Sequence, residues 1–267
     1  MRLFYSVFLM RFKTGLQYRV AALAAMGTQF FFGFMFIMIY RAFYKNAAAD
    51  PGIPLDQLVS YLWLNQAFLY WVAIWVQDRE TMDIIRSGGV AYELARPLNL
   101  YTLWFAKFVG QRVSGTLLRF LPIITVAFFL PEGFRLLPPV SVPAFLTFFL
   151  SLVLGLIIVV SFVLLIYMTG FYTLSSSGFL SFALFFSDIF TGQYVPLALM
   201  PINLQPVFYA LPFAYISDFP FRVYTGSVAL GEAGRGLLIQ LGWAVALPLL
   251  GYFVLNRALK RAVIQGG

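Results

Sequence analysis

Long apolar stretches separated by short polar segments dominate the chain. A helix needs roughly 20 apolar residues to cross the hydrocarbon core of a bilayer. Six stretches are long enough, which predicts an all-α integral membrane protein with six transmembrane helices in a single domain, 1–267. These predicted spans cover residues 21–44, 57–76, 112–130, 143–168, 171–194 and 237–256.

Composition agrees with that pattern and restricts the chemistry. Of the 267 residues, 61% are apolar and only 10% are charged, which is too few charges for a soluble domain of this length. The chain has no cysteine and no histidine. Disulfides, Cys/His zinc sites and nucleophilic triads with a histidine base are therefore excluded. We expect no catalytic residue and no metal site in this chain, which predicts a protein that is not an enzyme.

Residues 1–19 carry positive charges within an apolar run. On a helical wheel Arg2, Ser6, Lys13 and Gln17 share one narrow sector, which is typical of a helix lying in the membrane interface. The alternative is an extension of the first span. A cleavable signal does not fit, because no small-residue cleavage site follows.

Lysine and arginine counts predict the orientation of the spans. If both termini are cytoplasmic, the inner segments carry 12 of these residues and the outer segments 5, with Arg119 inside the third span. This asymmetry follows the positive-inside rule and predicts cytoplasmic termini. The net charge of +8 therefore reflects the orientation of the chain in the membrane, and no basic run indicates a nucleic-acid partner.

The segment 77–100 is then a cytoplasmic loop. Gly88–Gly89 should end a first helix, and Pro97 should stop a second, short amphipathic helix between them. An ordinary connection is the alternative, but the organised charge favours a docking element for another subunit. The residues expected to couple this chain to that subunit are Gly89, Val90, Glu93, Leu94 and Arg96.

The segment 195–236 is apolar but broken by prolines, which cannot continue a helix. Unpaired backbone at membrane depth must be buried in protein or line a cavity. We therefore expect a re-entrant hairpin on the outer side, with helical pieces near 203–210 and 213–224. It should act as an outer gate, or alternatively as a static lid. The gate residues are Pro196, Leu199, Leu204, Leu211 and Pro212.

Polar residues within the predicted spans are few. Ionisable residues in a membrane are functional candidates by default, although Asp188 is more often a structural hydrogen-bond partner at such a position. No phosphate-binding loop GxxxxGK[ST] occurs, so ATP and Mg²⁺ are expected on a partner subunit. Ordinary helix packing would explain the same aromatics as well as a pathway does. The pathway candidates are Asn65, Phe68, Phe182, Phe186 and Asp188.

Three short motifs resemble the permease subunits of bacterial type-2 ABC exporters, in the subgroup of short six-span permeases. The first is Tyr18–Arg19 at the end of the N-terminal helix. The second is the loop pattern of Ile85, Gly88, Leu94 and Arg96–Pro97. The third and most specific lies in the hairpin and consists of Gly192–Gln193, Pro196–Leu197, Leu211–Pro212–Phe213, Pro220, Tyr224 and Gly226.

The resemblance implies a transport subunit of the bacterial inner membrane. It implies two ATPase subunits docked on the cytoplasmic face and a second permease chain, identical or related, alongside in the bilayer. It also implies export of a hydrophobic or amphipathic substrate between the two permeases. A self-sufficient secondary transporter or channel, or a membrane assembly subunit without its own pathway, are the alternatives.

Overall fold

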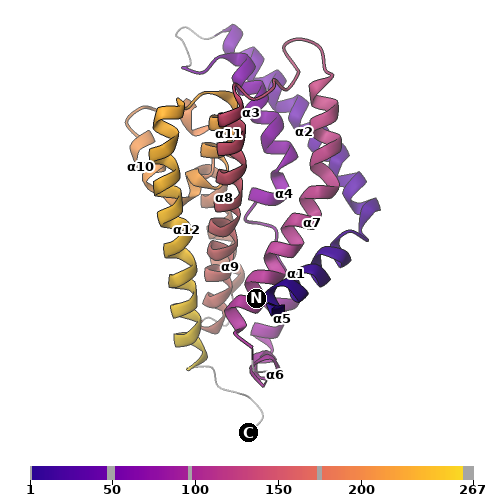
Figure 1. Cartoon of the computed structure of the whole chain (residues 1–267), viewed down its shortest axis with the longest axis vertical. Coiled ribbons are helices and arrows are strands. Elements are labelled where there is room, and N and C mark those ends of the chain that lie inside the picture. The colour runs from indigo at the N-terminus through magenta and orange to yellow at the C-terminus, as the bar shows by residue number, and fades with distance from the viewer. Residues whose placement is uncertain (1, 47–51, 96–97, 173–175, 261–267) are drawn as a thin grey trace.

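The computed structural model describes residues 2–46, 52–95, 98–172 and 176–260 (Figure 1). Every regular element in these ranges is a helix, and none of the residues in them forms a strand. The expected all-α class is therefore confirmed. Figure 1 has two distinct ends, with α1, α5, α6 and the last turns of α12 at its lower end and α10 toward its upper end.

The N-terminal helix α1 (Arg2–Gly15) is separate from α2 (Arg19–Lys45). A turn at residues 16–18 divides them, and α1 packs across the lower part of α7. A continuous extension of the first span is thus wrong. Placement of α1 in the membrane interface stays a prediction.

Long apolar helices make up most of the fold. Within the described ranges, three stretches are long and apolar enough to cross a membrane: Arg19–Lys45, Val142–Phe171 and Leu230–Leu259. They correspond to α2, to α8 (Val142–Met168) with the 3₁₀ turn η1 (Thr169–Phe171), and to α12 (Leu230–Leu259). Two more helices run along the same axis, α7 (Leu100–Phe128), which contains Pro122, and α9 (Ser176–Phe190).

The expected span 57–76 is not one helix, and that prediction was wrong. The structure has α3 (Leu55–Ala67), the short α4 (Leu69–Val72), and then extended chain from Ala73. A new helix, α5 (Arg79–Arg86), begins only after this unwound segment and does not continue α4. The cause is a side chain from α7, described below, which the local sequence does not reveal.

The glycine break in the 77–100 loop is confirmed. After α5, Gly88 has a φ of 74°, a conformation open mainly to glycine, and α6 (Val90–Leu94) follows. Asn99 then caps α7, its side chain accepting a hydrogen bond from the Thr102 amide at 3.0 Å. The loop is therefore an ordered pair of short helices, α5 and α6.

The proline-rich segment forms short helical pieces up to residue 225; the piece expected near 203–210 is present, the one expected at 213–224 is divided in two, and α12 already begins at Leu230. The pieces are η2 (Leu197–Leu199), α10 (Gln205–Ala210), η3 (Pro212–Tyr215) and α11 (Asp218–Thr225). Helix α11 packs against α8 and α3, so this segment is built into the upper half of the molecule (Figure 1).

Candidate functional site

A chain of ion pairs joins four helices at the lower end. Arg11 of α1 contacts Glu80 at the start of α5, and its Nη2 lies 3.5 Å from Asp78 Oδ2. Lys107 of α7 lies 3.9 Å from Glu80 Oε1 and 3.2 Å from Glu93 Oε1 of α6. The N-terminal helix, both loop helices and α7 are therefore linked by charge.

Helix α6 has an anchored face and an exposed face. Glu93 points inward, where Trp104 Nε1 donates a hydrogen bond to its Oε2 at 2.7 Å, and Val90 is buried. Tyr92 is on the opposite side of the helix, with 83% of its surface exposed, and Leu94, with 42% exposed, lies at the C-terminal end of the helix. Of the expected coupling residues, Leu94 is thus presented outward, while Glu93 and Val90 hold the helix in place.

The other two expected coupling residues, Gly89 and Arg96, flank α6. Gly89 is half-buried at the N-terminal end of the helix, and Arg96 lies outside the described residues. Tyr92 was not among the expected coupling residues. An aromatic residue two positions from the buried Val90, in a turn flanked by charge, is the signal that could have identified it.

The Glu80 carboxyl is ionised at neutral pH. Burial raises the pKa of the Glu80 carboxyl, but the hydrogen bond and charge of Arg11, together with Lys107, lower it further, so that the net pKa is below the ordinary value of 4.5. The Arg11–Glu80 pair therefore persists under cellular conditions.

A buried arginine explains the unwound segment after α4. Arg112 of α7 has no exposed surface, and its Nη1 donates to the carbonyl oxygens of Trp71 and Ala73 at 3.1 and 2.7 Å. Its Nη2 donates to the Val76 carbonyl at 3.3 Å. A helix that ends inside a protein leaves carbonyls unsatisfied, and this guanidinium satisfies them.

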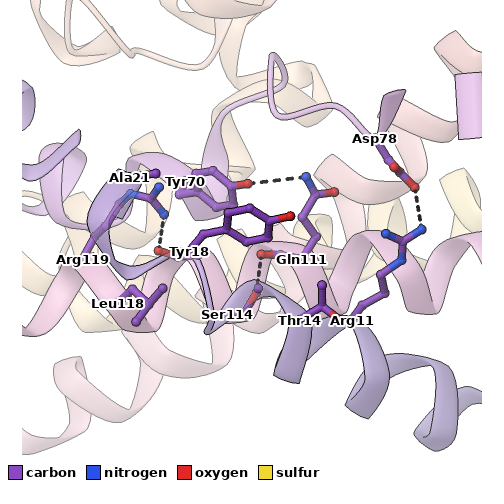
Figure 2. A pocket seen from close by; sticks show the side chains of 12 residues that line it. Arg11, Thr14, Tyr18, Ala21, Tyr70, Asp78, Gln111, Ser114, Leu118 and Arg119 are labelled. Carbon is purple, nitrogen blue, oxygen red and sulfur yellow. Dashed lines mark hydrogen bonds and ion pairs between the residues drawn. The ribbon is translucent and has the colours of Figure 1, made fainter. Parts of the chain in front are cut away.

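A polar pocket of about 340 Å³ lies where α1, α2, α4 and α7 meet (Figure 2). Figure 2 shows Arg11 and Arg119 at its opposite ends, with the rings of Tyr18 and Tyr70 between them. Gln111 Nε2 lies 3.4 Å from the Tyr70 hydroxyl and donates to the Gln77 carbonyl at 3.2 Å. The pocket separates the α1–α2 turn from α7.

A second pocket, of about 450 Å³, lies above the first and is called here the α2–α7 pocket. It shares Tyr70 and Arg119 with the first pocket. Its walls come from α2, from the α3–α4 region, from α7 and from the chain after α9. The lining residues are Ala25, Thr28, Gln29, Phe32, Phe36, Gln66, Leu69, Tyr70, Trp75, Arg119, Gln193 and Tyr194.

The expected pathway residues do not come together. Asn65 is buried, and its Nδ2 donates to the Gln193 carbonyl at 3.0 Å. Phe68 is packed among Phe120, Phe148 and Phe221 in the core. Ordinary packing therefore accounts for Phe68 within this chain.

The expected pathway residues on α9 lie at the surface instead. Phe182 and Phe186 are exposed, and their rings are 4.4 Å apart. Asp188, two residues after Phe186, is half-buried and has a side-chain hydrogen bond with Tyr194, which lines the α2–α7 pocket. Phe182 and Phe186 therefore form an exposed aromatic surface on α9, and Asp188 is tied to the α2–α7 pocket through Tyr194.

A buried polar centre holds the proline-rich segment in place. The Asp218 side chain is fully buried; its Oδ1 accepts a hydrogen bond from the Leu197 amide at 3.0 Å, and its Oδ2 lies 3.7 Å from Arg222 Nη1. The Tyr61 hydroxyl lies 3.2 Å from Asp218 Oδ1 and 3.1 Å from the carbonyl oxygen of Gly192, whose φ of 76° suits glycine. This centre ties α3 and α11 to the start of the segment.

Asp218 and Tyr61 were not among the residues expected at a site. Asp218 is one of ten acidic residues in the chain and stands in an apolar run, which is the signal that could have found it. Tyr61 has no such signal, because its partners are 131 and 157 positions away.

The expected gate residues differ in exposure: some are buried in the proline-rich segment, and one lies at its exposed tip. Pro196 and Pro212 are buried, and Leu199 and Leu211 are half-buried. Leu204 is exposed, as are its neighbours Ile202 and Val207. The exposed tip is therefore the stretch 201–207.

The comparison with family models decides the class of protein. The model of the ABC-2 family transporter proteins matches residues 30–266, which is most of the chain. The chain belongs to the ABC-2 transporter family. This permease is the membrane component of an ABC transporter, a multi-pass transport subunit that associates with ATPase subunits. No curated protein sequence matches it.

Proposed function

We propose that this permease is the membrane subunit of an ATP-driven exporter in the bacterial inner membrane. It crosses the bilayer six times, in α2, α3–α4, α7, α8, α9 and α12, with both termini in the cytoplasm. ATP and Mg²⁺ are held by two separate ATPase subunits, because the chain has no phosphate-binding loop.

The observation that carries the proposal is the construction of α6. A five-residue helix exposes Tyr92 on one side and Leu94 at its C-terminal end, while Glu93 fixes the helix to Lys107 and Trp104 of α7. Exposed aromatic and aliphatic side chains on a rigid support suit a partner's apolar pocket. Force applied to α6 reaches α7 directly, and it reaches α1 through Glu80 and Arg11.

The transport pathway lies between this chain and a second permease, identical or related. The surface formed by α2 and α9 near the α2–α7 pocket faces it, and Phe182, Phe186 and Asp188 belong to that surface. Its aromatic character suits a hydrophobic or amphipathic substrate.

The proline-rich segment closes the pathway on the outer side as a re-entrant hairpin. The buried centre at Asp218 keeps its base fixed, and the exposed tip at 201–207 carries apolar side chains able to exclude water. Leu199, Leu204 and Leu211 are the residues we expect to change environment during transport, with Pro196 and Pro212 holding the fold.

Copurification tests the proposal. The ATPase encoded beside the gene should purify with the permease in detergent, and the complex should hydrolyse ATP faster with a transported substrate. Failure of that ATPase to associate with the wild-type chain would overturn the proposal. A reporter fused at Gly267 that reads as extracytoplasmic would overturn the topology.

A further inference from the structure

The α2–α7 pocket contains one positive charge without a matching negative one. Arg119 Nη1 donates to the Gly115 carbonyl at 2.6 Å, and its guanidinium carbon lies 4.5 Å from the centre of the Tyr70 ring. No aspartate or glutamate pairs with Arg119 among the residues that the structure describes. A guanidinium has five N–H donors, so most of its donors remain available.

An unsatisfied acceptor lines the same pocket. Gln29 is only 4% exposed, and its Nε2 donates to the Gln66 carbonyl at 3.0 Å. That bond fixes the orientation of the amide, because only its nitrogen can donate to a carbonyl. Gln29 Oε1 is then left buried with no hydrogen-bond partner. A buried acceptor without a partner carries a free-energy cost that a bound donor would remove.

The remaining walls are largely apolar. Phe32 and Trp75 are exposed into the space between α2 and the end of α4, and Leu69 and Phe36 line it as well. A volume of about 450 Å³ is within the range of small-molecule sites. No carboxylate lines the pocket among the described residues, and the nearest acidic group tied to it is Asp188, through Tyr194.

We propose that the α2–α7 pocket binds the polar head of an anionic amphipathic molecule, and that such molecules are the exporter's substrates. Arg119 binds the phosphate or carboxylate in a charge-assisted contact, Gln29 Oε1 accepts a hydrogen bond from a hydroxyl or amine beside it, and the apolar tail lies along Phe32 and Trp75. The substrate assignment rests on the proposed export function; the binding site does not.

Trp75 lines the pocket, so ligand binding there can be measured by tryptophan fluorescence. A probe with a brominated acyl chain quenches tryptophan fluorescence on contact, so dibromostearoyl lysophosphatidic acid should quench the purified permease in dodecyl maltoside. Dibromostearoyl monoglyceride has the same tail and no charge, and it should bind at least tenfold more weakly. The Trp75→Phe variant should lose most of the quenching and thereby locate the signal.

Three arginine variants test the charge. Arg119→Gln should weaken binding of the anionic probe about ten- to a hundredfold and change monoglyceride binding less than threefold. Arg119→Lys should retain most of the affinity. Arg41→Gln is the matched control, since Arg41 also donates to a carbonyl, of Gly133, and lies over an aromatic ring, of Phe134, but outside this pocket.

Each outcome decides the proposal. Equal affinity for the two probes, or an Arg119→Gln variant that binds like the wild type, would overturn the anionic site. A variant that elutes as an aggregate is replaced by Arg119→Lys, whose loss of affinity with retained monodispersity would also count against it.

The substrate assignment is tested separately, by measuring ATP hydrolysis. In the complex with the ATPase, the anionic probe should raise ATP hydrolysis at least twofold, and the monoglyceride should not. Charge-dependent binding without stimulation would assign the pocket to a resident bilayer lipid and overturn the substrate assignment. Failure of the ATPase to associate would instead refute the export function, while the binding experiment on the permease alone would stand.

Discussion

The two ends of the molecule are held together by different interactions. At the upper end, the base of the hairpin is fixed by buried groups: Asp218 has no exposed surface, and Tyr61 is almost fully buried. At the lower end, α1 is linked to α5 by an ion pair that water can reach, since 56% of the Glu80 side chain is exposed, whereas the Lys107–Glu93 pair that holds α6 is largely buried.

The buried polar centre is harder to rearrange than the exposed ion pair. A buried polar centre is costly to break, because each group left alone would stay desolvated. Ion pairs near solvent contribute little net stability and can be exchanged for other partners. The upper end is thus built to hold one arrangement, and the exposed Arg11–Glu80 link at the lower end can be rearranged by a docking subunit.

The largest expected effect is at the buried centre. Asp218→Ala leaves the Leu197 amide without its acceptor and removes the carboxylate beside the Tyr61 hydroxyl and the buried Arg222 charge, and should lower the free energy of unfolding by about 3–5 kcal/mol. Thermal unfolding in detergent measures it. Tyr61→Phe removes one hydroxyl and should cost only about 1 kcal/mol. Equal losses for the two variants would show that Asp218 is not the centre of this network.

Charge reversal at α6 should have the next largest effect. Glu93→Lys places two ammonium groups together and leaves Trp104 Nε1 without its acceptor, so we expect α6 to detach and ATPase association to weaken at least tenfold. Pull-down with the ATPase measures it. The double variant Glu93→Lys/Lys107→Glu restores the pair and should recover much of the association. No recovery would indicate that the hydrogen bond from Trp104, which the double variant does not restore, matters more to the placement of α6 than the ion pair.

The exposed face of α6 should affect docking without affecting the fold. Leu94→Asp and Tyr92→Ala remove the apolar side chains offered to the partner, and each should weaken ATPase association about tenfold, with the melting temperature unchanged. Asp83, which is exposed on α5, supplies the control variant Asp83→Ala. Association that survives both substitutions would place the docking surface elsewhere.

The smallest effect is expected at the Arg11–Glu80 pair. Glu80→Gln should cost less than about 1 kcal/mol at neutral pH, because the glutamate is half-exposed. The folded-state pKa of Glu80 is lowered, so its contribution is present above the ordinary pKa of 4.5 and is lost as pH falls through the folded value. Between pH 7 and 3.5 the wild type should therefore lose slightly more stability than the variant. A larger loss for the variant would reverse this sign.

Much of the fold was predictable wherever a residue type restricts the backbone. The break at Gly88 and the short helices of the proline-rich segment followed from glycine and proline alone. The end of α4 was not predictable, because no glycine or proline stands between Phe68 and Val76. The helix is broken there by Arg112, a residue about 40 positions later in the chain.

The candidate site was predictable to the same degree. The sequence located α6 but not its orientation, since Glu93 looked like a surface charge until Lys107 and Trp104 were seen beside it. The aromatic residues Phe68 and Phe182 looked equivalent in sequence. Only packing distinguishes the first, which lies in the core, from the second, which lies on the surface.

Helix α7 connects the two functional regions as one rigid body, and Pro122 sets where that body ends. Lys107 and Arg119 are twelve residues apart, so with a rise of 1.5 Å per residue the lever arm between them is roughly 18 Å. Pro122 lacks the amide that would bond to the carbonyl of Leu118, and the helix bends most easily there. A tilt of roughly 5° imposed at α6 would displace Arg119 by roughly 1.5 Å over that arm, while the turns beyond Pro122 stay with the outer half of the molecule. Such a displacement is enough to break a hydrogen bond to a bound ligand.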